Sequence, residues 1–128
     1  MLLPPWTRTT DAPKNPDILS GYLTEALAFT AEARGHRAFA ALVRRQGIQD
    51  LFHVICQHTW HATRDWDVET FCFWAAFPAV EKDKELLDLF DTICCMTPLG
   101  DAEDEEEADA YWPDLVATVR GLCGASAN

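Results

Sequence analysis

Apolar residues recur at intervals of three and four positions along most of the chain, the spacing that gathers them on one face of an α-helix. Asn15-Pro16-Asp17 is a typical helix start, because a capping side chain precedes a proline at the first helical position. Gly35 and Gly47 stand where the first two helices should end. The pattern predicts helices at about 17–34, 36–46, 48–61, 82–96 and 113–123.

The segment from Val68 to Phe77 is compatible with two structures. Its aromatic and β-branched residues favour a buried strand. However, Asp67 is a good N-cap, and the alanines before Pro78 continue a helix to that proline. No second strand-like run exists in the sequence to pair with this one, and an isolated strand would leave its backbone groups unmatched. A further helix is therefore the better interpretation.

The predicted fold is an all-α protein, a compact irregular bundle of five or six helices in a single domain. A chain of 128 residues is long enough to form one core without disulfides. Positions 1–16 contain four prolines and are expected to form an extended lead. The helical domain is expected over 17–123, with an acidic loop at 101–109 and a frayed tail at 124–128.

Charge is distributed very unevenly between the two halves of the chain. Positions 1–64 carry seven cations and five acids, whereas positions 65–128 carry three cations and sixteen acids, for a net charge of −11. Such asymmetry predicts one strongly negative face. It argues against direct nucleic-acid binding, which needs cations to displace counterions from phosphate. It favours a basic protein partner that is drawn in by electrostatic steering.

The densest acidic run has seven carboxylates in nine positions and no cation, and Tyr111 and Trp112 follow it closely. Like charges four positions apart cost about 0.2–0.5 kcal/mol per pair in a helix, so a loop or a weak helix is expected. Aromatic anchors beside charges are typical of interface hot spots, and Trp66 is a third candidate anchor. The expected partner-binding acids are Asp101, Glu103, Asp104, Glu105, Glu106, Glu107 and Asp109.

These features suggest a small acidic protein-binding module. The specific hypothesis is an inhibitor of the immunity or anti-defence type, which covers the basic groove of a nucleic-acid-processing enzyme or a nuclease toxin. A groove that binds phosphate is cationic, so an acidic partner associates quickly and competes with the substrate. The simpler alternative is a solubilising loop with no partner. An adaptor or secretion chaperone would share the acidic surface but present a larger apolar groove.

A metal-binding protein or small metal-dependent enzyme is the alternative from a different class. His58, His61 and Asp65 follow one another at helical spacing, and His53 and Cys56 share another face of the same predicted helix. Imidazole, thiolate and carboxylate are all zinc ligands. No second cluster with ligand spacing is evident in the sequence, so polar surface histidines are the simpler interpretation and no cofactor is expected.

No catalytic fingerprint is present, and we expect no enzymatic activity. The sequence lacks a nucleophile elbow and a phosphate-binding glycine loop. The cysteine count is five, and no pair has C-x-x-C spacing, which indicates free thiols in a reducing compartment. Neither a secretory signal nor an apolar run long enough for a membrane span is found, so a cytoplasmic protein without membrane association is expected.

Overall fold

The computed structural model describes residues 4–8, 11–60, 65–96 and 105–124. Within these residues the chain is all-α, as predicted, with one short 3-10 turn, seven α-helices and no strand. The helix count exceeds the predicted five or six, in part because Pro78 begins an additional helical turn directly after the preceding helix ends. The elements are η1 (Pro5–Arg8), α1 (Pro16–Ala33), α2 (Arg37–Gln46), α3 (Ile48–Trp60), α4 (Val68–Ala76), α5 (Pro78–Glu81), α6 (Lys84–Met96) and α7 (Glu105–Leu122).

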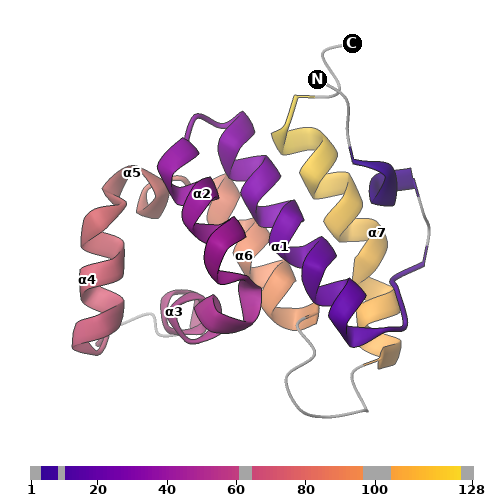
Figure 1. Ribbon diagram of the computed structural model, residues 1–128, viewed down its shortest axis with the longest axis horizontal. Helices are drawn as coiled ribbons and strands as arrows, with labels where there is room; N and C mark the ends of the chain where they lie inside the picture. Colours follow the sequence, from indigo (N-terminus) through magenta and orange to yellow (C-terminus); the bar gives the residue numbers. More distant parts are fainter. Residues whose placement is uncertain (1–3, 9–10, 61–64, 97–104, 125–128) are drawn as a thin grey trace.

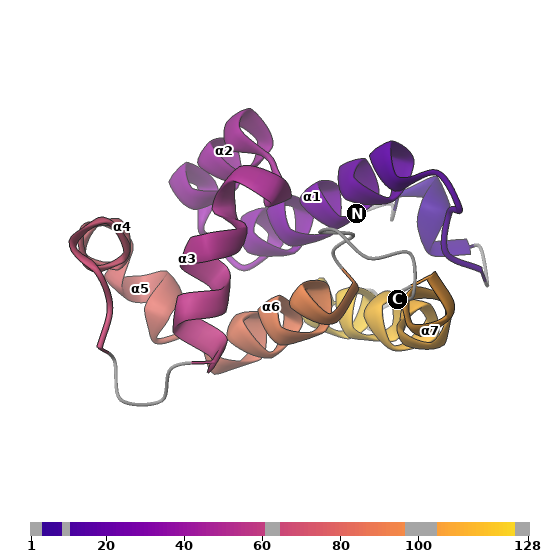
Figure 2. The same ribbon diagram turned by 90° about the horizontal axis from the view of Figure 1, so that it is seen from below.

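The helices form two layers joined by α3. Helices α1 and α2 pack against each other in one layer, and α6 and α7 lie side by side in the other (Figure 1). Helix α3 contacts α1, α2 and α6 and so links the layers, whereas α4 and α5 extend from one end of the molecule (Figure 2). None of the described helices combines the length and the apolar character that are needed to cross a membrane.

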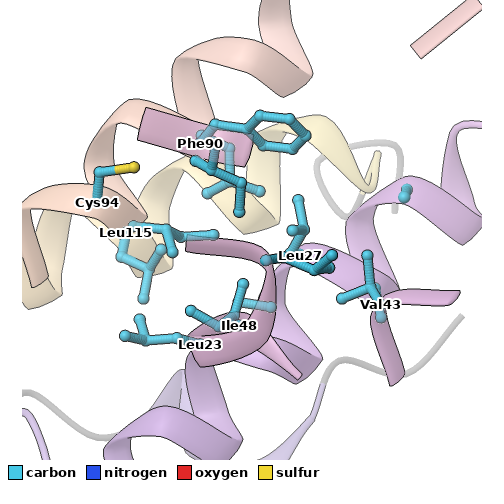
Figure 3. Close-up of a cluster of buried hydrophobic side chains, with 14 of the residues drawn as sticks. Leu23, Leu27, Val43, Ile48, Phe90, Cys94 and Leu115 are labelled. Carbon is cyan, nitrogen blue, oxygen red and sulfur yellow. The ribbon is translucent and has the colours of Figure 1, made fainter. Parts of the chain in front are cut away.

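The core lies where α1, α2, α3, α6 and α7 meet. Leu23 and Leu27 of α1, Ile48 of α3, Phe90 of α6 and Leu115 of α7 have no exposed surface. Figure 3 shows these side chains converging from their different helices on one space. Complete burial of a leucine, isoleucine or phenylalanine contributes about 1.5–3 kcal/mol. The two layers are therefore held together chiefly by apolar contacts.

Local signals in the sequence fix several helix ends. The side chain of Asn15 accepts a hydrogen bond of 2.8 Å from the backbone N–H of Asp17, as expected for the predicted start of α1. Gly35 and Gly47 have φ angles of 92° and 84°, a region that side chains disfavour. Gly47 follows α2 directly, and Gly35 follows α1 after the cap residue Arg34. Helix α4 is confirmed, and the side chain of Asp67 caps it by accepting a hydrogen bond of 2.8 Å from the N–H of Thr70.

The C-terminal helix differs from its prediction. It begins at Glu105 and not at Pro113, which lies inside it. Positions 105–109, for which a loop or a weak helix was expected, are therefore helical, and positions 101–104 lie outside the described residues. Packing explains the difference, because the buried side chains of α7 form one helical stripe beside α6 that outweighs a proline penalty of about 3 kcal/mol. That stripe consists of Trp112, Leu115, Val116 and Val119.

The N-terminal lead also contains structure. Pro5–Arg8 form a 3-10 turn in which Trp6 is only 5% exposed. The indole of Trp6 stacks on Tyr22 at a ring distance of 6.0 Å and contacts Trp112 at 5.8 Å. Arg120 of α7 donates a hydrogen bond to the carbonyl oxygen of Thr7. The described part of the lead is thus attached to α1 and α7, whereas positions 125–128 of the predicted tail lie outside the described residues.

Candidate interaction surfaces

The layer formed by α6 and α7, hereafter the acidic layer, carries much of the protein's negative charge. Exposed carboxylates of its described side chains are Glu85, Asp88, Asp91 and Asp114. The first five positions of α7, Glu105-Glu-Glu-Ala-Asp109, add four more acids to the same layer. Against these stand two described cations, Lys84 and Arg120. The fold therefore brings the acids of two separate sequence segments onto adjacent helices.

An open hollow of about 540 Å³ lies on the surface between α3 and α6. Asp88 and Asp91 line it together with Lys84, Leu87 and His58. Two carboxylates one helical turn apart can both accept hydrogen bonds from one guanidinium or ammonium group. The hollow is thus a chemically suitable place for a basic side chain.

The arginines of the basic half are partly engaged within the protein. Arg44 of α2 donates hydrogen bonds of 2.9 Å to both Glu25 and Glu32 of α1. The acids that Arg44 contacts therefore belong to the same half of the chain as Arg44 itself. Arg44 thus meets two carboxylates of α1 and does not offset the negative charge of the acidic layer.

A second charged cluster joins the end of α1 to the start of α6. Arg34 donates hydrogen bonds of 2.7 and 2.9 Å to Asp83, and Nε2 of His36 lies 3.0 Å from the same carboxylate. Asp83 also accepts a hydrogen bond from the backbone N–H of Leu86. Burial alone would raise the pKa of Asp83, but these hydrogen bonds outweigh it and lower the pKa to about 2. The side chain of Asp83 is only 11% exposed, so the cluster is structural.

The three predicted aromatic anchors have different environments. Tyr111 is 38% exposed and available to a partner, whereas Trp112 has no exposed surface. A side chain without exposed surface cannot contact a partner in this fold, so Trp112 is a core residue and its prediction as an anchor is corrected. Trp66 is half-buried and stacks on the imidazole of His58 at a ring distance of 5.6 Å.

The histidines do not assemble a metal site within the described residues. Nε2 of His53 lies 2.6 Å from the carboxylate of Asp67, and the ring of His58 lies 4.6 Å from that of Trp74. His61 falls outside the described part of the chain. Among the residues that the structure describes, no group of three potential ligands could hold a metal ion. The thiol of Cys56 is buried, 4.0 Å from the thiol of Cys94.

One surface was not anticipated from the sequence. Helix α4 turns Thr70 and Trp74 inward, with 0% and 1% exposure, and leaves an apolar face in solvent. Val68 is 80% exposed and Phe71 is 62% exposed. The remaining exposed apolar residues of this face, hereafter the α4 outer face, are Cys72, Ala75 and Ala76. The one signal in the sequence is that α4 carries a single charged residue, Glu69, so its apolar residues must surround the helix.

Two surfaces of the described residues are therefore candidates for binding, the acidic layer and the α4 outer face. They differ in chemistry, because the first is rich in carboxylates and the second is almost uncharged. Comparison with protein-family models, with curated proteins and with solved structures found no match to this chain.

Proposed function

We propose that the chain is a small acidic protein-binding module whose partner is a basic protein. One observation carries the proposal: α6 and α7 lie side by side, which combines their acids in one layer. A surface of this kind attracts cationic proteins over the Debye length, about 8–10 Å at moderate salt. The acidic layer thus supports both fast association and selection against acidic partners.

Specific contacts within the layer are assigned by their exposure and position. The hollow lined by Asp88 and Asp91 accepts a lysine or arginine side chain of the partner. Tyr111, at the exposed side of α7, supplies an aromatic contact next to the acids at the start of that helix. Trp66 lies outside the layer but stacks on His58, which lines the hollow, and is a further candidate contact. Trp112 is left out because it is buried.

The specific form of the proposal is an inhibitor of the immunity or anti-defence type. A nuclease or nucleic-acid-binding toxin presents a cationic groove, and a layer of carboxylates can occupy that groove in place of phosphate. Competition of this kind requires no catalytic residue in the inhibitor.

The partner is identified by capture at low salt. The purified chain is immobilised, incubated with lysate of its source cell and eluted with a salt gradient, and the eluted proteins are identified by mass spectrometry. A basic protein that leaves the column at high salt is the expected result, because screening weakens contacts between exposed charges. Elution of acidic or neutral proteins alone would contradict the proposal.

The assignment to the acidic layer is tested with the captured partner. In the variant Asp88→Lys/Asp91→Lys, the association rate should fall by about tenfold or more, and its dependence on salt should become weaker. Asp11→Lys/Asp50→Lys is the matched control, since both acids are exposed outside the acidic layer and the change in net charge is equal. An equal fall of the association rate in both double variants, or no fall in Asp88→Lys/Asp91→Lys, would show that the acidic layer is not the binding surface.

A further inference from the structure

We propose that the α4 outer face binds a short amphipathic segment of a basic protein, one in which lysine or arginine stands among apolar residues. Of the six exposed residues of α4, five are apolar and only Glu69 is charged. Exposed apolar residues that occur singly are ordinary, but a continuous apolar face marks an interaction site. The face is separate from the acidic layer, so the inference does not depend on the proposed function.

Helix α4 is held firmly on its opposite side. Trp74 is buried and contacts Phe73 at a ring distance of 5.1 Å, Phe90 at 5.7 Å and Phe39 at 6.5 Å. Asp67 caps the helix at its N-terminus. Because these contacts fix α4 on the bundle, the apolar side chains of the outer face stand in a defined arrangement, and a partner segment does not have to order them.

Carboxylates border the apolar residues of the face and are hereafter the acidic rim. The rim consists of Asp65, Asp67, Glu69 and Glu81. The first three lie at the N-terminal end of α4, and Glu81 of α5 lines a hollow beside the face. Lys82 is the only cation among residues 65–82. A cationic partner is therefore attracted to the rim, whereas an acidic partner is repelled.

The hollow beside the face has a volume of about 260 Å³ and matches a basic side chain. Its lining consists of Trp66, Phe71, Trp74, Ala75 and Glu81. Lysine and arginine combine an apolar stem with a cationic end, and that cation is attracted to the face of an aromatic ring. The aromatic wall thus receives the stem, and the carboxylate of Glu81 receives the charge.

Charge argues against a second copy of this chain at the face. Two chains of net charge −11 repel each other, and face-to-face docking would bring their acidic rims together. A surface of anionic lipids is repelled for the same reason. A basic amphipathic segment instead meets opposite charge at the rim and apolar side chains at Val68 and Phe71, which are 80% and 62% exposed.

The size of the face favours a short segment over a folded domain. Nine helical residues span about 13 Å, whereas stable dimers bury about 800 Å² on each partner, more than so short a helix provides. Short amphipathic segments bind an apolar surface through a few anchors, and charges at the margin orient them. We therefore expect a reversible contact that added salt weakens, because screening reduces the attraction between the rim and the cations of the segment.

Selection from a peptide library tests the inference. Random peptides of about 12 residues, long enough to cover α4 as a helix, are displayed on phage and selected on the immobilised chain. Peptides that bind the unaltered chain and Ile18→Asp but not Phe71→Asp bind at the face, since Ile18 is also an exposed large apolar residue, at 48%, but lies on α1. These peptides should be enriched in lysine or arginine beside apolar residues. Peptides that are acidic or uncharged, or the absence of any peptide that depends on Phe71, overturn the inference.

Anisotropy titration with a selected, fluorophore-labelled peptide measures the contribution of the rim. Asp65→Asn/Glu69→Gln should raise the Kd by about fivefold or more, and its dependence on salt should become weaker. Asp11→Asn/Asp17→Asn is the matched control, because it removes the same charge from exposed acids near the start of α1, far from α4 in both views (Figures 1 and 2). Its Kd should stay within about twofold of that of the unaltered chain. Equal Kd values for the two double variants overturn the inference.

The thiol of Cys72 locates the bound peptide in the unaltered chain. At about ten times its Kd, the peptide should slow the modification of Cys72 by a water-soluble maleimide about tenfold, because the occupied face covers this thiol. Unchanged labelling of Cys72 overturns the inference. Sedimentation equilibrium at about 0.1 mM protein should show a monomer. A dimer that Phe71→Asp dissociates would place a second copy on the face, which also overturns the inference.

Discussion

Arg34 and Asp83 are 49 positions apart in the sequence and are joined by two hydrogen bonds of 2.7 and 2.9 Å. The pair ties the turn after α1 to the turn before α6, and so connects the two layers at their polar edge. The only other side chain at hydrogen-bond distance from this carboxylate among the described residues is that of His36, at 3.0 Å. The relationship has consequences for stability at low pH.

The first prediction concerns acid unfolding. The pKa of Asp83 is lowered to about 2 in the folded protein, below its value near 4 in an unfolded chain. A lowered folded-state pKa means that the contribution is complete above pH ~4 and is lost as the pH falls from ~4 towards ~2. Arg34→Ala should lower the free energy of unfolding by about 2 kcal/mol at neutral pH. The difference from the unaltered chain should shrink below pH ~4.

Urea titrations at several pH values provide the measurement. Arg37→Ala is the matched control, because Arg37 is exposed at the start of α2, and its removal should change the free energy of unfolding by less than about 0.5 kcal/mol. If Arg34→Ala lowers the free energy of unfolding by the same amount at every pH between 7 and 2, the role of the ionised Asp83 carboxylate is contradicted.

The second prediction compares two phenylalanines. Phe39 of α2 is 2% exposed and stacks on Phe90 at 5.9 Å, and it also meets Phe77 at 5.4 Å. Phe39→Ala should therefore lower the free energy of unfolding by about 3–5 kcal/mol. Phe71→Ala removes the same atoms from a side chain that is 62% exposed, so its cost should be below about 1 kcal/mol. Thermal melts of the two variants separate these outcomes.

Sequence reasoning succeeded where one local pattern decided the structure. The stripe through Leu51 and Ile55 predicted α3, and the stripe through Leu86, Phe90 and Ile93 predicted α6, because both helices bury the face that the spacing indicates. Caps and turns such as Asn15 and Gly35 fixed the ends of α1. These signals act within a few positions of the chain, so they can be recognised in the sequence without knowledge of the tertiary structure.

Errors arose where distant contacts overrode local rules. Proline is common at the first position of a helix, so the last helix was predicted to begin at Pro113. Burial of Trp112 and Leu115 beside α6 instead extends α7 through this proline. Spacing could have placed Trp112 in the core, since it lies three and four positions before Leu115 and Val116. Nothing local indicates that Trp6 packs on Tyr22. The exposed side of α4 likewise depends on where the rest of the bundle lies, and an almost wholly apolar helix does not reveal it.

The third prediction concerns the capping of α4. The backbone N–H of Thr70, and after it the side chain of His53, lower the pKa of Asp67 to about 2, so the cap remains ionised across the ordinary pH range. Asp67→Ala removes the acceptor from the first turn and should lower the melting temperature. Asp67→Asn keeps an acceptor for the N–H of Thr70 and should lower it less. Differential scanning calorimetry measures the melting temperatures of both variants. Equal values for Asp67→Ala and Asp67→Asn would contradict the capping role.

The last prediction separates the five thiols by their reactivity. Cys72 is exposed on α4, whereas Cys56 and Cys94 are buried. Burial also raises the pKa of Cys56 and of Cys123, which directly follows α7, and this reduces the fraction of reactive thiolate. A water-soluble maleimide should therefore label Cys72 first, and peptide mass spectrometry should locate the adduct there. Equal labelling of Cys56 and Cys72 would contradict the packing of α3 against α6.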